Sequence, residues 1–132
     1  MKIYTHHHWN ITLPDNWVVE EDTDYTAVYP PDGVGDLLIS SFEHDDLVTD
    51  DDLEEFAADH IESDVDSEDV EYGDFNGFSF CYSIENEYIC EWYLKYEKIM
   101  LFITYSCPVE NEENSEEDIV ETSLNSLRRT TH

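Results

Sequence analysis

Residues 98–127 have the sequence KIMLFITYSCPVENEENSEEDIVETSLNSL, which predicts a buried strand, an acidic turn and a closing amphipathic helix. In the strand, the odd-numbered side chains from Ile99 to Tyr105 form one apolar face. The even-numbered side chains begin apolar, with Met100 and Phe102, and end polar. Since successive side chains of a strand point to opposite faces, this pattern predicts a central strand that is covered on both faces for part of its length.

The closing helix is predicted from a cap and one apolar stripe. Ser115, followed three residues later by Asp118, resembles a helix N-cap with an acid in the first turn. Val120, Leu124 and Leu127 then recur at helical spacing. We expect Leu124 and Leu127 to be buried beneath this helix.

Length and composition indicate one globular domain covering residues 1–132. The chain has 132 residues, of which 40% are hydrophobic and 14% aromatic, so a sizeable core is expected despite a net charge of −29. No basic-then-apolar signal peptide is visible, and no apolar run approaches the ~20 residues of a membrane span. We therefore expect a cytoplasmic protein that does not associate with membranes.

The three cysteines are predicted to be reduced core residues. Cys81, Cys90 and Cys107 have no CxxC spacing, and their odd number, without an export signal, argues against disulfides. A nucleophilic cysteine needs nearby positive charge, which this acidic chain lacks. We expect no enzymatic activity.

The N-terminal segment alternates in polarity. Apolar residues stand at odd positions between Ile3 and Leu13, which predicts one strand over residues 3–13 with His7 on its buried side. His6 and His8 would then share the other face, but two ligands do not make a metal site. No metal or cofactor is expected.

Further strands are expected at residues 24–29 and 37–42, followed by a helix capped by Thr49. That helix places Leu53 and Phe56 at helical spacing. Its first turn holds three aspartates, whose negative charge interacts favourably with the positive end of the helix dipole. After a linker over residues 63–69, a strand over 70–75 is expected, with a turn at Asn76-Gly77.

Two more alternating strands, residues 78–84 and 88–96, lead into the strand that begins at residue 99. The resulting order is β-β-β-α-β-β-β-β-α, with short turns between consecutive strands. It predicts an α+β domain in which a mostly antiparallel sheet of six to seven strands is flanked by two helices.

Several of these segments together resemble a known family. They are ITLP at residues 11–14 with Trp17, DDLEEFA at 51–57, the Asn76-Gly77 pair, LFITYSCP at 101–108 and SLNSL at 123–127. The chain is similar over nearly its whole length to the PsbP-like family, which includes the DcrB-like proteins and chaperones of bacterial Rhs-type toxins. The resemblance implies a fold and a binding role, and it carries no catalytic residues.

Charge is where this chain departs from that pattern. No Lys or Arg occurs between Ile3 and Leu94, and most of the 34 acidic residues lie there. The acid forms three blocks, at residues 43–55, 62–74 and 110–121. The negative electrostatic field of so many carboxylates favours fast capture of a cationic surface. We expect the densest block to bind a basic protein through Asp45, Asp46, Asp50, Asp51, Asp52, Glu54 and Glu55.

Other ligands are less compatible with the sequence. Residues 64–75 begin like a calcium loop, but Asp69 stands where the turn glycine is needed and Phe75 where the bidentate glutamate is needed. The net charge would repel a nucleic-acid backbone.

Three interpretations therefore remain for the function. The first is an immunity or inhibitor protein that neutralises a basic toxin, for example a nuclease, by covering its substrate-binding surface. The second is a chaperone or adaptor for a secreted toxin, which should expose an apolar surface. The third is a salt-adapted protein whose charge has no binding role.

Overall fold

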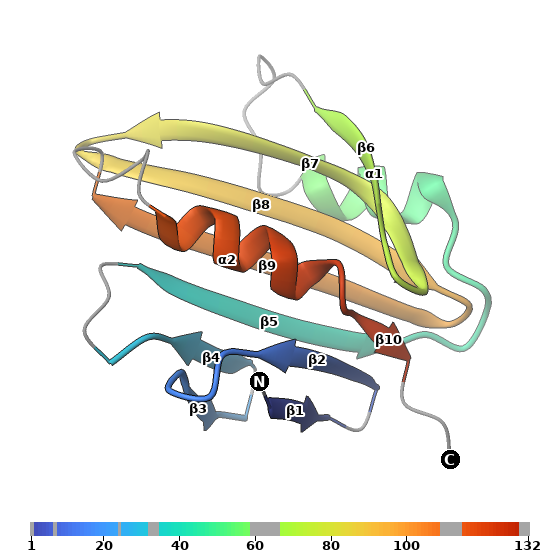
Figure 1. The fold of residues 1–132 in the computed structure, drawn as a ribbon. Helices are drawn as coiled ribbons and strands as arrows, with labels where there is room; N and C mark the ends of the chain where they lie inside the picture. Colours follow the sequence, from blue (N-terminus) through green and yellow to red (C-terminus); the bar gives the residue numbers. More distant parts are fainter. Residues whose placement is uncertain are drawn as a thin grey trace.

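The computed structural model describes residues 2–6, 8–23, 25–31, 35–58, 67–108 and 115–129. These residues form two antiparallel β-sheets and two α-helices, which is the predicted α+β class (Figure 1). The predicted succession of strands, helix, four strands and helix is present. The structure adds two strands before the first helix and one short strand after the second.

The larger sheet has seven strands, and β9 (Ile99–Pro108) lies between β5 (Asp36–Glu43) and β8 (Glu87–Tyr96). The outer strands are β4 (Thr26–Tyr29) and β3 (Val18–Glu21) beyond β5, and β7 (Phe75–Ile84) and β6 (Glu68–Tyr72) beyond β8. As predicted, β9 is a central strand: Leu101 and Ile103 are buried on one face, and Met100 is buried on the other.

The smaller sheet has the order β1-β2-β10 and corrects the prediction of one strand over residues 3–13. The segment is instead a hairpin of β1 (Lys2–Thr5) and β2 (Trp9–Leu13). The turn is closed by backbone and side chain together, because the His6 amide donates to the Trp9 carbonyl (2.7 Å) and the His8 amide donates to His6 Nδ1 (3.2 Å). Ile3 is 70% exposed as a result. His7, predicted to be buried, lies outside the described residues.

The two helices cover opposite faces of the larger sheet (Figure 1). Helix α2 (Ser115–Leu124) and the smaller sheet cover one face, where Val120, Leu124 and Leu127 join the main core. Helix α1 (Asp50–Ala58) covers part of the other face. Neither helix, over the part of the chain that the structure describes, is long and apolar enough to cross a membrane.

The segment that follows α2 contacts the β6–β7 turn, and the position of this turn differs from the predicted one. The β6–β7 turn lies at Gly73-Asp74, where Gly73 has φ +62° and the Asp74 amide donates to the Leu127 carbonyl (3.3 Å). The predicted turn at Asn76-Gly77 is wrong, since both residues lie within β7. Gly77 is required there by a close approach, because a Cβ would lie 1.8 Å from the Tyr93 carbonyl oxygen.

Two short strands were not predicted. Strand β3 pairs with β4 and is only partly buried, so it lacks a clear alternation. Strand β10 (Arg128–Arg129) is exposed and pairs with β2; the Arg129 amide also donates to Asp74 Oδ2 (3.1 Å). The predicted cap Ser115 begins α2, and its side chain lies outside the described part. The predicted linker over residues 63–69 lies partly outside it as well.

The prediction of reduced cysteines is wrong for one pair. Cys81 lies directly opposite Cys90 in the β7–β8 register, and a disulfide joins them. Cys107 is a buried thiol outside this disulfide. The odd number of cysteines could not indicate which two face each other across a hairpin.

Thiol counting tests the disulfide. The chain denatured without reductant should react as one thiol, from Cys107, and as three thiols after reduction. Three thiols before reduction would contradict the Cys81–Cys90 bond.

Helix α2 should depend strongly on Leu124, which is completely buried. Replacing Leu124 with Ala removes buried methyl groups and leaves a cavity, so urea unfolding should show a loss of about 2–5 kcal/mol. Thr122→Ala is the matched control, since Thr122 is exposed on the same helix and its loss should cost about 0.5 kcal/mol or less. Equal unfolding midpoints for the two variants would be incompatible with this packing.

Candidate protein-binding surface

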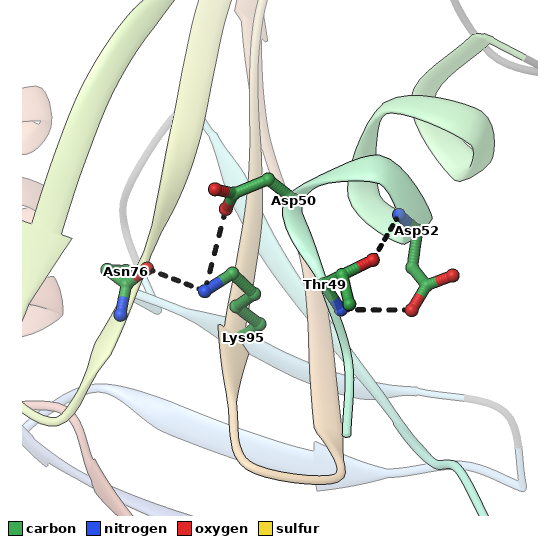
Figure 2. Close-up of polar contacts among 5 residues, drawn as sticks. All are labelled: Thr49, Asp50, Asp52, Asn76 and Lys95. Atoms are coloured by element: carbon green, nitrogen blue, oxygen red, sulfur yellow. Dashed lines mark hydrogen bonds and ion pairs between the residues drawn. The ribbon is translucent and has the colours of Figure 1, made fainter. Parts of the chain in front are cut away.

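The start of α1 is fixed by a reciprocal cap, as the sequence predicted for Thr49. The Thr49 hydroxyl accepts a hydrogen bond from the Asp52 amide (3.2 Å), and Asp52 Oδ2 accepts one from the Thr49 amide (2.9 Å), as Figure 2 shows. The bond from the Thr49 backbone amide holds the pKa of the Asp52 carboxyl below its ordinary value. Asp52 therefore has a structural role.

The inward side of α1 orients the rest of the helix. Leu53 and Ala57 are buried, and the Phe56 ring packs edge-on against Tyr93 and Phe102 with centroids 5.9 and 5.5 Å away. Because this side faces the sheet, the carboxylates on the opposite side are turned outward. Asp51, Glu54 and Glu55 are exposed.

The loop before α1 is attached to the β8–β9 turn at two points. The His44 amide donates to the Lys98 carbonyl, and the Val48 amide donates to the Glu97 carbonyl, each at 2.8 Å. Residues 45–47 therefore project between two fixed ends. All three are exposed, with Asp45 and Asp46 beside the loop's leucine.

Asp50 is partly neutralised by a basic residue of the same chain. Lys95 Nζ lies 3.5 Å from Asp50 Oδ1 and donates to Asn76 Oδ1 at 3.2 Å (Figure 2). The Asp50 side chain is nevertheless 82% exposed, so this ion pair is weak. Of the seven predicted residues, Asp52 serves the cap, Asp50 pairs with Lys95, and five form what we call the acidic surface: Asp45, Asp46, Asp51, Glu54 and Glu55.

The structure also joins two acidic blocks that the sequence kept apart. A cleft of about 410 Å³ between α1 and strands β6 and β7 is lined by Asp50 and Glu54 from the first block and by Asp69 and Glu71 from the second. The pairing of β6 with β7 produces this convergence, and a single sequence carries no signal for it. The acidic surface therefore continues into this cleft.

The described carboxylates of the third acidic block do not share this surface. Residues 110–114 of this block lie outside the described part, and Asp118 and Glu121 are on α2, across the sheet from α1. The Glu121 carboxylate accepts hydrogen bonds from the Tyr72 hydroxyl at 3.1 and 3.2 Å. Burial, together with the Glu121 charge, raises the pKa of Tyr72 to about 12.

Among the residues that the structure describes, one acidic side chain is buried, and sequence reasoning missed it. Glu91 is 4% exposed, and its carboxylate accepts hydrogen bonds from Tyr82 (2.5 Å) and Tyr93 (2.7 Å). Burial and the bond to Glu91 raise the pKa of Tyr82 to about 12. The sequence feature that could have revealed this burial is the alternation of β8, which places Glu91 and Tyr93 on the face toward α1.

A second cleft, of about 300 Å³, contains the two histidines considered for metal binding. His6 and His8 line it with Glu21 and Asp22, and His8 Nδ1 lies 2.9 Å from Ser41 Oγ. Within the described ranges, no group of three or more His, Cys, Asp or Glu side chains is arranged to hold a metal ion.

The cap predicts a pH-dependent contribution from Asp52. Since its pKa is lowered in the folded state, the bond stabilises the fold above the ordinary value of 3.8, and this stability is lost as the pH falls through the lower folded pKa. We therefore expect Asp52→Asn to melt below the parent at pH 7, with the difference shrinking below pH 3.8. Asp51→Asn is the control, and an equal and parallel change in that variant would refute the role of the cap.

Known proteins resemble this chain in fold. No protein-family model matches it, and no curated protein sequence does. A crystal structure from Bacteroides thetaiotaomicron superposes with a TM-score of 0.69 at 16% identity; it covers 94% of this chain, which spans only 46% of that one. LpqN, involved in cell envelope biogenesis of Mycobacterium tuberculosis, superposes with a TM-score of 0.62 at 11% identity over 93% of this chain and 83% of LpqN. At these identities the likeness shows a shared fold, and it fits the PsbP/DcrB-like fold that the sequence resemblance implies.

Proposed function

We propose that this chain is an acidic protein-binding module, and specifically an immunity or inhibitor protein that neutralises a basic toxin such as a nuclease. The observation that supports this proposal is the acidic surface itself. Five carboxylates are exposed on one helix and one anchored loop, with more carboxylates in the adjoining cleft. A nuclease presents basic side chains to the phosphates of its substrate, and a carboxylate array can occupy those side chains instead.

Electrostatics gives such an inhibitor fast association. With a net charge of −29, the chain attracts a basic partner over a distance of about 10 Å at 0.1 M salt. Fast capture suits an inhibitor that must act before the toxin reaches its substrate. The role needs no catalytic group or cofactor.

A second candidate follows from the resemblance to the PsbP-like family, since that family includes chaperones of Rhs-type toxins. A chaperone or adaptor of this kind would hold apolar segments of a secreted toxin. Exposed apolar side chains, with Leu47 64% and Phe42 40% exposed, favour this candidate. Salt resistance separates the two candidates, because apolar contacts survive salt that weakens electrostatic ones.

Affinity capture from the native host tests the proposal. A basic protein should be retained at about 0.05 M salt and released at about 0.5 M, and its activity should be inhibited by one equivalent of this chain. A toxin segment that stays bound at high salt would favour the chaperone instead. A parent protein that is unfolded at about 0.1 M salt would favour salt adaptation.

The contact residues are tested by neutralising four carboxylates together, Asp45→Asn, Asp46→Asn, Glu54→Gln and Glu55→Gln. Association with the captured partner should slow by roughly tenfold or more at low salt and lose much of its salt dependence. The melting temperature should stay level or rise, because repulsion between carboxylates falls.

The control neutralises four exposed carboxylates away from the acidic surface: Asp36, Glu85, Glu87 and Asp118. The strand register places Asp36 and Glu87 at the end of the sheet opposite to the loop before α1. Both variants carry the same net charge. Equal association rates for them would exclude the acidic surface as the contact.

A further inference from the structure

Two exposed apolar side chains lie in or directly beside the first acidic block: Leu47 is within it and Phe42 immediately precedes it. In the part of the chain that the structure describes, the large apolar side chains with high exposure are Ile3 (70%), Leu47 (64%), Phe42 (40%) and Tyr25 (39%). Leu47 and Phe42 are five positions apart, and Asp45 and Asp46 lie between them. Apolar and acidic groups therefore share one short segment.

Leu47 is held in its exposed position. The loop that carries it is fixed at both ends, by the His44 and Val48 amides on the Lys98 and Glu97 carbonyls. Val48, the next residue, is 94% buried, so the loop could turn inward only by breaking that anchor. The backbone hydrogen bonds at the two ends of the loop therefore keep Leu47 exposed.

Phe42 connects this loop to the core. Its ring lies 5.6 Å from the Phe56 ring, which packs against Tyr93 and Phe102. Phe42 is therefore the outer member of an aromatic cluster that continues beneath α1. A partner that covered it would extend an existing core.

We propose that Leu47 and Phe42 form the apolar centre of the acidic surface, and that the occupant is a protein segment with apolar side chains flanked by Lys or Arg. This inference rests on the proposed binding function and specifies the chemistry of its partner. Charge complementarity selects the occupant, because the two aspartates beside Leu47 favour basic flanks. An apolar centre within a polar rim is also the usual anatomy of a protein interface.

The two kinds of contact have separate kinetic effects. The carboxylates act at long range and set the association rate and its salt dependence. Leu47 acts only after contact and slows dissociation, since leaving the complex returns its apolar surface to water.

Two synthetic peptides serve as probes. One is an amphipathic 14-residue peptide of Leu and Lys, and the other has the same Lys positions with Ser in place of every Leu. Binding is measured by titration calorimetry and surface plasmon resonance with the full chain. The Leu–Lys peptide should bind at least roughly tenfold more tightly than the Ser–Lys peptide.

The variant Leu47→Asn should lose roughly tenfold in affinity for the Leu–Lys peptide, through faster dissociation, and should bind the Ser–Lys peptide like the parent. The matched control is Ile3→Asn, because Ile3 has a similar exposure (70% against 64% for Leu47) but lies in β1, outside the acidic block. Ile3→Asn should bind both peptides like the parent. Melting curves of both variants should match the parent, since neither side chain is buried.

Each of the alternative results contradicts a specific part of the proposal. If both peptides bind the parent equally, the electrostatic function stands and the apolar centre is wrong. If the two variants lose affinity equally, the apolar contact is unspecific and the inference fails. If neither peptide binds at low salt, the proposed function fails together with the inference.

Discussion

The structure depends on the burial of both faces of strand β9. One face packs beneath α2 and the smaller sheet, and the other packs beneath α1. Because β9 is hydrogen-bonded to β5 and β8, both cores are attached to the same backbone. The outward direction of the acidic surface follows from this arrangement, since α1 can bury Leu53 and Ala57 only by turning its carboxylates to solvent.

The net charge of −29 is accommodated, over the described ranges, by giving the buried carboxylate polar partners and leaving most other carboxylates in water. Glu91 is the buried case, and the Tyr82 and Tyr93 hydroxyls compensate its desolvation. Asp52 stabilises the first turn of α1, and Glu121 is bound to Tyr72. These local roles explain part of the acid. The acidic surface keeps its charge exposed, at the cost of repulsion between neighbouring carboxylates.

Periodic and capped segments could be predicted, and features that depend on distant partners could not. Strand β9, the Thr49 cap and the stripe of α2 each carry their signal within a few residues. The disulfide and the position of Gly77 depend on what lies across a hairpin, which alternation alone cannot specify. The His6 turn is local, but its hydrogen bonds cannot be read from the alternation of residues 3–13. The same distinction applies to the candidate site. Helical spacing predicted the inward side of α1 through Leu53 and Phe56, whereas the cleft shared with β6 arises from strand pairing.

The loop between His44 and Val48 enters and leaves at neighbouring carbonyls of a single turn. Its two ends are therefore fixed independently of the three residues between them. These three residues could be replaced by other residues or by a longer segment held at the same anchors, for a small entropic cost and without moving β5 or α1. The fold thus offers a self-contained grafting position, where a foreign recognition peptide can be displayed beside a rigid helix.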